Sequence, residues 1–281
     1  MTSSSGTRRD VLDAHLRYHL ANGVDHVIVT DNLSRDRTPE ILAHHQREGR
    51  VSVLHEPADH FAQAKWVTRM ARRAHLEHGA DWVINSDADE FWWPRRGSLT
   101  SSLAGVPAQV GIVPVPRADF VPVTDDGRPF FRRMTIRERH SANALGRRLA
   151  PKVCHRGRAD IELTQGNHAV SRPRLAVLDG PAPLEILHFP LRTFAQFERK
   201  IVQGAEAYER NLEVGPEVGD AWRHLYRLHR DGTLRDYYDR KALSGARIEA
   251  GLRSGVLVRD RRLHRFMASL ATSRDAVPGA G

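Results

Sequence analysis

The chain has 281 residues, of which 40% are hydrophobic and 27% charged. This composition is typical of a folded globular protein and excludes a disordered one, and the length suits one large domain or a domain with an appendage. No run approaches the roughly 18 apolar residues of a membrane-spanning helix, and the first residues lack the apolar core of a secretory signal. Cys154 is the only cysteine, which excludes an intrachain disulfide and favours a cytoplasmic protein.

The positive charge is concentrated near the carboxyl end. The net charge is +9, and residues 222–266 contain twelve Arg or Lys against five Asp or Glu. A basic segment of this kind is suited to bind an anionic membrane surface, nucleic acid or a phosphorylated ligand. The alternative is that its charged side chains only form the solvated faces of helices. We therefore expect either a cytoplasmic protein or one that also docks peripherally at the inner face of the membrane.

The first third of the chain alternates between strand and helix patterns. The predicted elements are a strand at 24–30, a helix at 38–48, a strand at 51–56, a helix at 60–78 and a strand at 81–86. Thr38 is a plausible N-cap, Pro39 follows at the first helical position, and Gly49 ends the first helix. The second helix has one apolar face, formed by Phe61, Ala64, Val67, Met70, Ala71 and Ala74. Short joints in this order predict parallel strands in a layered α/β sheet.

The pattern changes after Pro94. Residues 110–123 read as an irregular extended segment because of their prolines, and 151–156 and 184–190 read as short strands. From residue 192 a helix is predicted by apolar residues at steps of three and four, namely Phe194, Phe197, Ile201, Ala205, Tyr208 and Leu212. Residues 214–220 break it, and a basic helical tail follows. We expect a catalytic domain at 1–190 and a helical extension at 191–281 packed on it.

The segment "WVINSDADEFWWP" (82–94) places Asp87, Asp89 and Glu90 directly behind a buried strand. Ligands of parallel sheets bind at the carboxyl ends of the strands, where Asp31 and Asp87 both stand. On an extended chain Asp87 and Asp89 point to the same side, and two converging carboxylates are suited to Mg²⁺ or Mn²⁺ shared with substrate phosphates. The alternative is a loop whose acids cap the next segment or pair with Arg95 and Arg96.

Other chemistries have less support. His15 and His19 have helical i, i+4 spacing, but the glutamate of a zinc hydrolase helix is missing between them. The sequence contains no GxxxxGK, GxGxxG or GxSxG motif.

Several segments together resemble the glycosyltransferase family 2-like proteins with a GT-A fold. They are "GVDHVIVTDNLSRDRTPEI", "ADWVINSDADEFWW", "PKVCHR", "GNH" and "HFPLRTFAQFERK", and they span roughly residues 10–200. The resemblance implies a GT-A-like layered α/β/α domain with a mostly parallel sheet and a helical C-terminal extension. It also implies a nucleotide-sugar donor, a divalent metal, Mn²⁺ or Mg²⁺, and transfer of the sugar to a hydroxyl of a glycan or lipid-linked acceptor.

The resemblance assigns roles to individual residues. Asp87 and Asp89 would hold the metal and the donor diphosphate, with His188, or alternatively His168, completing the metal shell. The donor-binding set that it implies comprises Asp31, Asn32, Asp36 and Arg192. Arg192 and Lys200 would neutralise phosphate, or they form the solvated side of a helix.

The general base that inversion of the sugar carbon would need is not identified by a motif. Asp119 and Glu90 are the candidates, and Asp119 has the better position. Trp92 and Trp93 are placed either to stack on a sugar or to fill the core. Family members usually begin with a strand ending in "RNE" or "RDE", of which only "RRD" remains here. We therefore expect that strand to be truncated or lost, with weaker donor binding.

Two other functions compete with sugar transfer. Phosphoryl or nucleotidyl transfer on two metals would use the same acid pair, but the sequence offers no further acid cluster. A degenerate, non-catalytic GT-A-like protein would instead bind an anionic polymer or a membrane surface through its basic tail; nucleic acid is the less favoured partner.

Overall fold

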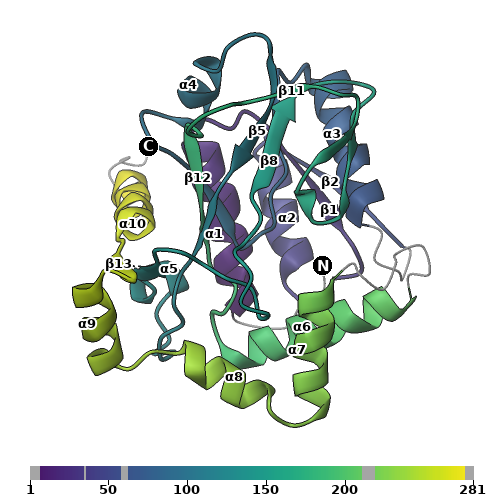
Figure 1. Cartoon of the computed structure of the whole chain (residues 1–281). Helices are drawn as coiled ribbons and strands as arrows, with labels where there is room; N and C mark the ends of the chain where they lie inside the picture. Colours follow the sequence, from purple (N-terminus) through teal and green to yellow (C-terminus); the bar gives the residue numbers. More distant parts are fainter. Residues whose placement is uncertain (1–6, 35, 58–62, 211–218, 276–281) are drawn as a thin grey trace.

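The computed structural model describes residues 7–34, 36–57, 63–210 and 219–275 (Figure 1). The helices are α1 (Thr7–Ala21), α2 (Thr38–Arg47), α3 (Gln63–His78), α4 (Leu99–Ala104), α5 (Phe130–Arg133), η1 (Gln165–Asn167), α6 (Phe194–Arg210), α7 (Asp220–Arg230), α8 (Leu234–Lys241), α9 (Gly245–Ser254) and α10 (Arg262–Asp275). The strands are β1 (Val27–Asp31), β2 (Val51–His55), β3 (Trp82–Ile84), β4 (Glu90–Pro94), β5 (Val110–Val115), β6 (Arg117–Asp119), β7 (Ile136–Glu138), β8 (Lys152–Arg156), β9 (Glu162–Leu163), β10 (Val170–Arg172), β11 (Ala176–Val177), β12 (Leu184–His188) and β13 (Leu257–Arg259).

The predicted alternation of the first third is confirmed as β1, α2, β2, α3 and β3, and β1 pairs with β2 in parallel. The N-cap prediction is wrong by one position, because Thr38 is already helical and Arg37 is the cap residue. Instead, the Asp36 carboxylate accepts a hydrogen bond from the Thr38 N–H at 2.9 Å and so satisfies one of the unpaired N–H groups at the start of α2. Val67 and Ala71 are buried on the apolar face of α3, whereas Phe61 lies outside the described residues.

The prediction of a mostly parallel sheet is wrong. Among the strand pairs of the described residues, three are parallel and five antiparallel. β8 runs antiparallel to both β3 and β5, and β12 runs antiparallel to β4. A parallel crossover needs a connection of about a dozen residues, usually a helix. After Pro94 the chain supplies few such helices between strands, so its strands return in the opposite direction.

The sheet is split beside β1. Within the described segments β1 pairs only with β2, and β3 pairs only with β8, in the order β11–β5–β8–β3. The α3 side chain of Val67 packs with Val83 of β3, while Val27 and Val29 of β1 pack with α1 and α2. Among the described residues no strand pairs with both β1 and β3.

The core beneath α1 contains most of the aromatic bulk. The Tyr18 hydroxyl donates to the Trp92 carbonyl at 2.8 Å, and Phe91 and Phe189 pack around it. Trp92 is fully buried, and Trp93 stacks on Tyr18 with ring centroids 5.7 Å apart. Trp92 is thus a core residue and Trp93 is a partly buried residue packed against the core, and neither lines the cavity described below.

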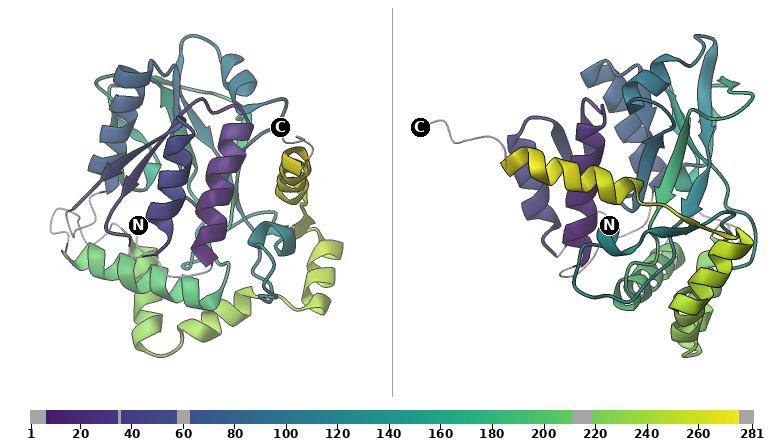
Figure 2. Two further views of the ribbon diagram at one scale, coloured as in Figure 1. Left: turned by 180° about the vertical axis from the view of Figure 1, so that it is seen from behind. Right: turned by 90° about the vertical axis from the view of Figure 1, so that its left-hand side faces the viewer.

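The chain beyond residue 190 is mainly helical. In Figure 1 the helices α6, α7 and α8 lie across one end of the strands, while Figure 2 shows α10 beside α1. β13 pairs with β7, so the extension also joins the preceding domain through a strand. Leu212, at the end of the predicted helix, lies outside the described residues. None of the described helices is both long and apolar enough to cross a bilayer.

Candidate functional site

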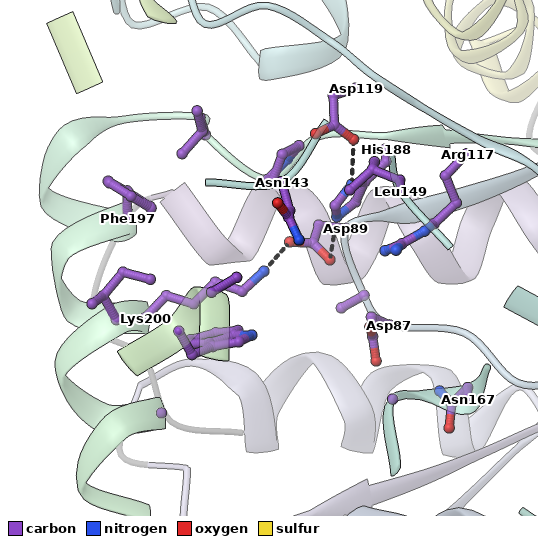
Figure 3. A pocket seen from close by; sticks show the side chains of 18 of the residues that line it. Asp87, Asp89, Arg117, Asp119, Asn143, Leu149, Asn167, His188, Phe197 and Lys200 are labelled. Atoms are coloured by element: carbon purple, nitrogen blue, oxygen red, sulfur yellow. Dashed lines mark hydrogen bonds and ion pairs between the residues drawn. The ribbon is translucent and has the colours of Figure 1, made fainter. Parts of the chain in front are cut away.

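A cavity of about 1520 Å³ lies between the strand ends and the helices α6 to α8. Its wall brings together residues from all parts of the chain, including Asn32, Asp87, Asp89, Asp119, His188 and Lys200. Figure 3 shows Asp89, His188 and Asp119 in succession, with Lys200 reaching Asp89 from the opposite wall. The acidic cluster after β3 thus faces a cavity, as its position in the sequence predicted.

The chain does not stay extended through this cluster. Ala88 and Asp89 form a turn, closed by a hydrogen bond from the Glu90 N–H to the Asp87 carbonyl at 3.0 Å. The predicted extended geometry is therefore wrong, because β4 begins at Glu90 and the chain must reverse before it. Both carboxylates nevertheless line the cavity.

Asp87 is bound by a buried lysine. Lys152 Nζ lies 2.7 Å from Asp87 Oδ2 and 3.3 Å from Glu90 Oε1, and Lys152 is only 2% exposed. The antiparallel pairing of Ile84 with Cys154 carries Lys152 just past the end of β3, beside Asp87. Burial raises the pKa of Asp87, but the Lys152 ammonium outweighs it and holds the pKa below its ordinary value.

Asp89 is surrounded by cations of the C-terminal extension. Lys200 Nζ lies 2.7 Å from Asp89 Oδ2, and Arg192 Nη1 lies 3.6 Å from the same oxygen. Burial again raises the pKa of Asp89, and Lys200, His188 and Arg192 together lower it well below the ordinary value. Asp89 is therefore ionised at any physiological pH.

His188 and Asp119 meet because their strands are paired. β12 and β6 run parallel with His188 opposite Asp119, and the His188 Nδ1–H donates to Asp119 Oδ1 at 2.7 Å. The other ring nitrogen, Nε2, lies 3.8 Å from Asp89 Oδ1. A carboxylate that fixes Nδ1 in this way leaves Nε2 as the basic nitrogen, which is the usual arrangement of a metal-binding histidine.

The site offers few side chains that could hold a metal ion. Among the described residues, no three or more His, Cys, Asp or Glu side chains are grouped to hold a metal ion. Asp89 and the correctly oriented His188 are two adjacent donors, whereas Asp87 is held by Lys152. Mg²⁺ and Mn²⁺ sites often use one or two protein ligands and complete their shell with substrate phosphate and water. The donor set fits that class.

The residues expected to bind the donor are only partly at the cavity. Asn32 lines it and donates to the Glu56 carbonyl at 2.9 Å. Asp31 is buried and accepts the Ser34 N–H at 3.3 Å, and Asp36 caps α2. Arg192 is 3% exposed, and its guanidinium donates to the Phe189 carbonyl at 2.7 Å. Asp31, Asp36 and Arg192 are not among the residues that line the cavity, although Arg192 lies 3.6 Å from Asp89.

Glu90, one of the two candidate bases, is fully buried and does not line the cavity. It lies 3.3 Å from both Lys152 and Arg117. Asp119, the other candidate, lines the cavity with a side chain that is 20% exposed. His168, the alternative metal ligand, also lines the cavity, and its Nδ1–H donates to the Pro151 carbonyl at 2.8 Å.

The sequence reasoning did not identify Lys152, Gln63 or His15 as site residues. Lys152 is the first residue of β8, and a lysine at the start of a buried strand is the signal that could have identified it. The Gln63 amide donates to Asp87 Oδ1 at 3.2 Å. His15 lines the cavity, and burial lowers its pKa to about 4, so its imidazole is neutral at pH 7.

Five of the thirteen buried side-chain atoms that lack a hydrogen-bond partner within the described residues belong to residues that line this cavity. They are His15 Nδ1, Thr30 Oγ1, Gln165 Nε2, Asn167 Oδ1 and Arg199 Nε. Each such group costs about 1–3 kcal/mol when it stays unpaired, and buried polar groups of this kind are uncommon.

Comparison with known families agrees with a transferase. Residues 10–104 match the model of glycosyltransferase family 92. This match supports a glycosyltransferase. It covers about a third of the chain, from α1 to α4, and includes Asp87 and Asp89. The matching model is that of family 92 and not of family 2, so the match supports the resemblance seen in the sequence only at the level of glycosyltransferases. A search of curated proteins found no match to the chain.

Proposed function

We propose that this protein transfers a sugar from a nucleotide-diphosphate donor to an acceptor hydroxyl of a glycan or lipid-linked acceptor. The observation that carries the proposal is the contact series Asp89, His188 and Asp119 at a large cavity. It places an ionised carboxylate, an oriented imidazole and a second carboxylate side by side. The family match over 10–104 supports the same reaction class.

The donor diphosphate is placed near the two aspartates. Lys200 and Arg117 line the cavity and are the cations that would contact the diphosphate, while Lys152 neutralises Asp87. Asn32, at the end of β1, is in reach of the nucleoside because it lines the same cavity. Without donor, Lys200 neutralises Asp89. On donor binding its ammonium turns to the diphosphate oxygens.

Asp89 and His188 are the residues that would hold Mn²⁺ or Mg²⁺. The ion would supply positive charge to the departing diphosphate. Asp119 orients His188 for this purpose, and Asp87 stays with Lys152. This division of roles differs from the sequence-based expectation, in which both aspartates bound the metal.

Asp119 also receives the acceptor proton. Its Oδ1 accepts the His188 N–H, and its second carboxylate oxygen accepts the hydrogen of the acceptor hydroxyl. The acceptor oxygen forms a bond to the anomeric carbon, while the bond from that carbon to the diphosphate oxygen breaks and its electron pair leaves with the nucleotide. The proton ends on Asp119. Glu90 has no direct role with substrate in this scheme, because it is enclosed by Lys152 and Arg117.

Nucleotide release measures this activity directly. The protein would be incubated with a panel of nucleotide sugars and Mn²⁺, with and without mixed glycan acceptors. We expect release from at least one donor, and loss of at least 100-fold in Asp89→Asn. Asp160→Asn is the matched control, because Asp160 is exposed and paired with Arg158 away from the cavity. Release that is absent for every donor, or equal in both variants, would refute the proposal.

A non-catalytic protein that docks on an anionic membrane is the second candidate. The C-terminal helices favour it, since Arg247, Arg253 and Arg265 are exposed and lie outside the cavity wall. Binding to anionic vesicles that weakens steeply with salt, and that is lost when these three arginines become glutamine, would support peripheral docking of a cytoplasmic protein. Nucleotide release, together with no preference for anionic over neutral vesicles, would favour the enzyme alone.

A further inference from the structure

The loop from Ser141 to Leu149 brings a polar side chain, that of Asn143, to the cavity. The loop closes on itself, because the Leu149 N–H donates to the Ser141 carbonyl at 3.1 Å. Asn143 lines the cavity, and in Figure 3 its side chain points toward Asp89. The loop therefore adds to the cavity wall a polar group that the ends of the strands do not supply.

The turn at the tip of this loop determines which end of the Asn143 amide faces the cavity. Asn143 Oδ1 accepts the N–H of Leu145 at 3.0 Å and the N–H of Arg147 at 3.1 Å, which occupies both lone pairs of that oxygen. Gly146 has φ of 75° and donates its N–H to the Asn143 carbonyl at 3.0 Å. A reversed amide would place its own N–H groups against these two donors, so the oxygen belongs to the turn and Nδ2 to the cavity.

The amide nitrogen of Asn143 is accessible to a ligand. Within the described part of the chain Nδ2 makes no hydrogen bond, in contrast to Oδ1 of the same side chain. Asn143 is only half-buried, and Nδ2 is not among the unpaired atoms that are sealed in the interior. Two N–H donors at a fixed position are therefore open to the cavity.

The loop is anchored beside the proposed catalytic groups. The Asp119 N–H donates to Ser141 Oγ at 2.8 Å, and Ser141 is buried. At the tip of the loop, Arg147 forms an ion pair with Asp220 at the start of α7. One contact ties the loop to the strand that carries Asp119, and the other ties it to the C-terminal extension. The Asn143 amide is thus held in place relative to Asp119 before substrate binds.

We propose that Asn143 Nδ2 donates hydrogen bonds to the diphosphate of the nucleotide-sugar donor, an assignment that rests on the proposed function. Asn143 points toward Asp89, which would hold the metal-bound diphosphate. An amide NH₂ group only donates, so it suits an oxygen that gains negative charge as the bond to the anomeric carbon breaks. The acceptor hydroxyl does not suit it, because that oxygen needs its lone pair to attack the anomeric carbon. A metal ion does not suit it either, because the Asn143 oxygen already accepts two N–H groups.

The variants Asn143→Asp and Asn143→Ser test the assignment. Both keep an oxygen that can accept the N–H groups of the turn, and both remove the amide nitrogen. Binding of inorganic diphosphate, a nucleoside diphosphate and its nucleotide sugar would be measured by calorimetry with Mn²⁺, and kcat by nucleotide release. We expect both variants to bind the two diphosphates at least about 10-fold more weakly and to lower kcat by about 100-fold.

The two variants also separate the amide from a simple effect of charge. Asn143→Asp adds a negative charge that repels diphosphate, so a loss in this variant alone, with Asn143→Ser equal to the wild type, would overturn the assignment. Weakening confined to the nucleotide sugar would place the amide against the transferred sugar and would overturn it as well. A wild-type protein that turns over no nucleotide sugar refutes the proposed function, and this assignment with it. Turnover and diphosphate binding that both variants preserve refute the assignment alone.

Discussion

Replacing the buried lysine of the acidic cluster should destabilise the whole protein. Lys152 is 2% exposed and contacts both Asp87 at 2.7 Å and Glu90 at 3.3 Å. Lys152→Met keeps the length of the side chain and removes its charge. Two carboxylates then lose a cation, and one of them, Glu90, is fully buried.

The size of the effect follows from what remains around each acid. Breaking a buried ion pair by removing one partner costs about 3–5 kcal/mol. Arg117 still lies 3.3 Å from Glu90, and the Asp87 side chain is 29% exposed and can be rehydrated. We therefore expect the lower end, about 3 kcal/mol. In a chain of this size, that corresponds to a melting temperature lower by about 6–12 °C.

Urea unfolding at pH 7.5 measures the loss, and a double-mutant cycle assigns it. Glu90→Gln removes the buried charge that Lys152 neutralises, so the double variant should be more stable than the sum of the two single effects predicts, by about 1–3 kcal/mol. Lys65→Met, at an exposed position of α3, is the control and should change stability by less than about 0.5 kcal/mol. A loss below about 1 kcal/mol in Lys152→Met, or strict additivity in the cycle, would show that this ion pair does not stabilise the fold.

Three further changes separate the roles of the site residues. Lys200→Met should bind Mn²⁺ more tightly, because a competing cation leaves Asp89, but should bind nucleoside diphosphate about 10-fold more weakly; calorimetry measures both. Burial holds the pKa of His15 at about 4 against 6.5 in the unfolded chain, so its contribution to stability is complete above pH 6.5. That contribution, about 3 kcal/mol, should be lost as the pH falls from 6.5 to 4, and His15→Leu should flatten this part of the urea-unfolding profile. Asp119→Asn should lower kcat by at least 100-fold if Asp119 takes the acceptor proton, whereas a residue that only orients His188 would mainly weaken Mn²⁺ binding.

The elements of the first third could be predicted because their signals are local. The run 24–30 and the helix starting near Thr38 are set by β-branched residues, by Pro39 and by Gly49, all within one segment of chain. The direction of the later strands could not be predicted in the same way. β8 is inserted antiparallel between β3 and β5, and that pairing depends on which distant edges are free when the strand arrives.

The site was predicted in part for the same reason. Asp87 and Asp89 follow a buried strand, and a strand end is a local signal for a ligand site. Their orientation was not predicted, because the turn at Ala88 is imposed by the pairing of β4 with β12. Lys152 is more than sixty residues away from Asp87 in the chain, and only the β3–β8 register brings it there.

The helical extension is part of this site rather than a separate module. Lys200 of α6 supplies the cation closest to Asp89, and Trp222 of α7 packs into α6, where a Cβ at Gly204 would lie 2.5 Å from its ring. Tyr237 and Lys241 of α8 continue the same cavity wall. A boundary at residue 190 therefore passes through the site, between His188 and Lys200.

The basic charge of the extension has two separable parts: Lys200 and Lys241 face the cavity, whereas the exposed arginines of α9 and α10 lie outside it. Substitutions of the cavity lysines test catalysis, and substitutions of the exposed arginines test membrane docking. Deleting the whole extension would remove both at once and could not separate the two roles.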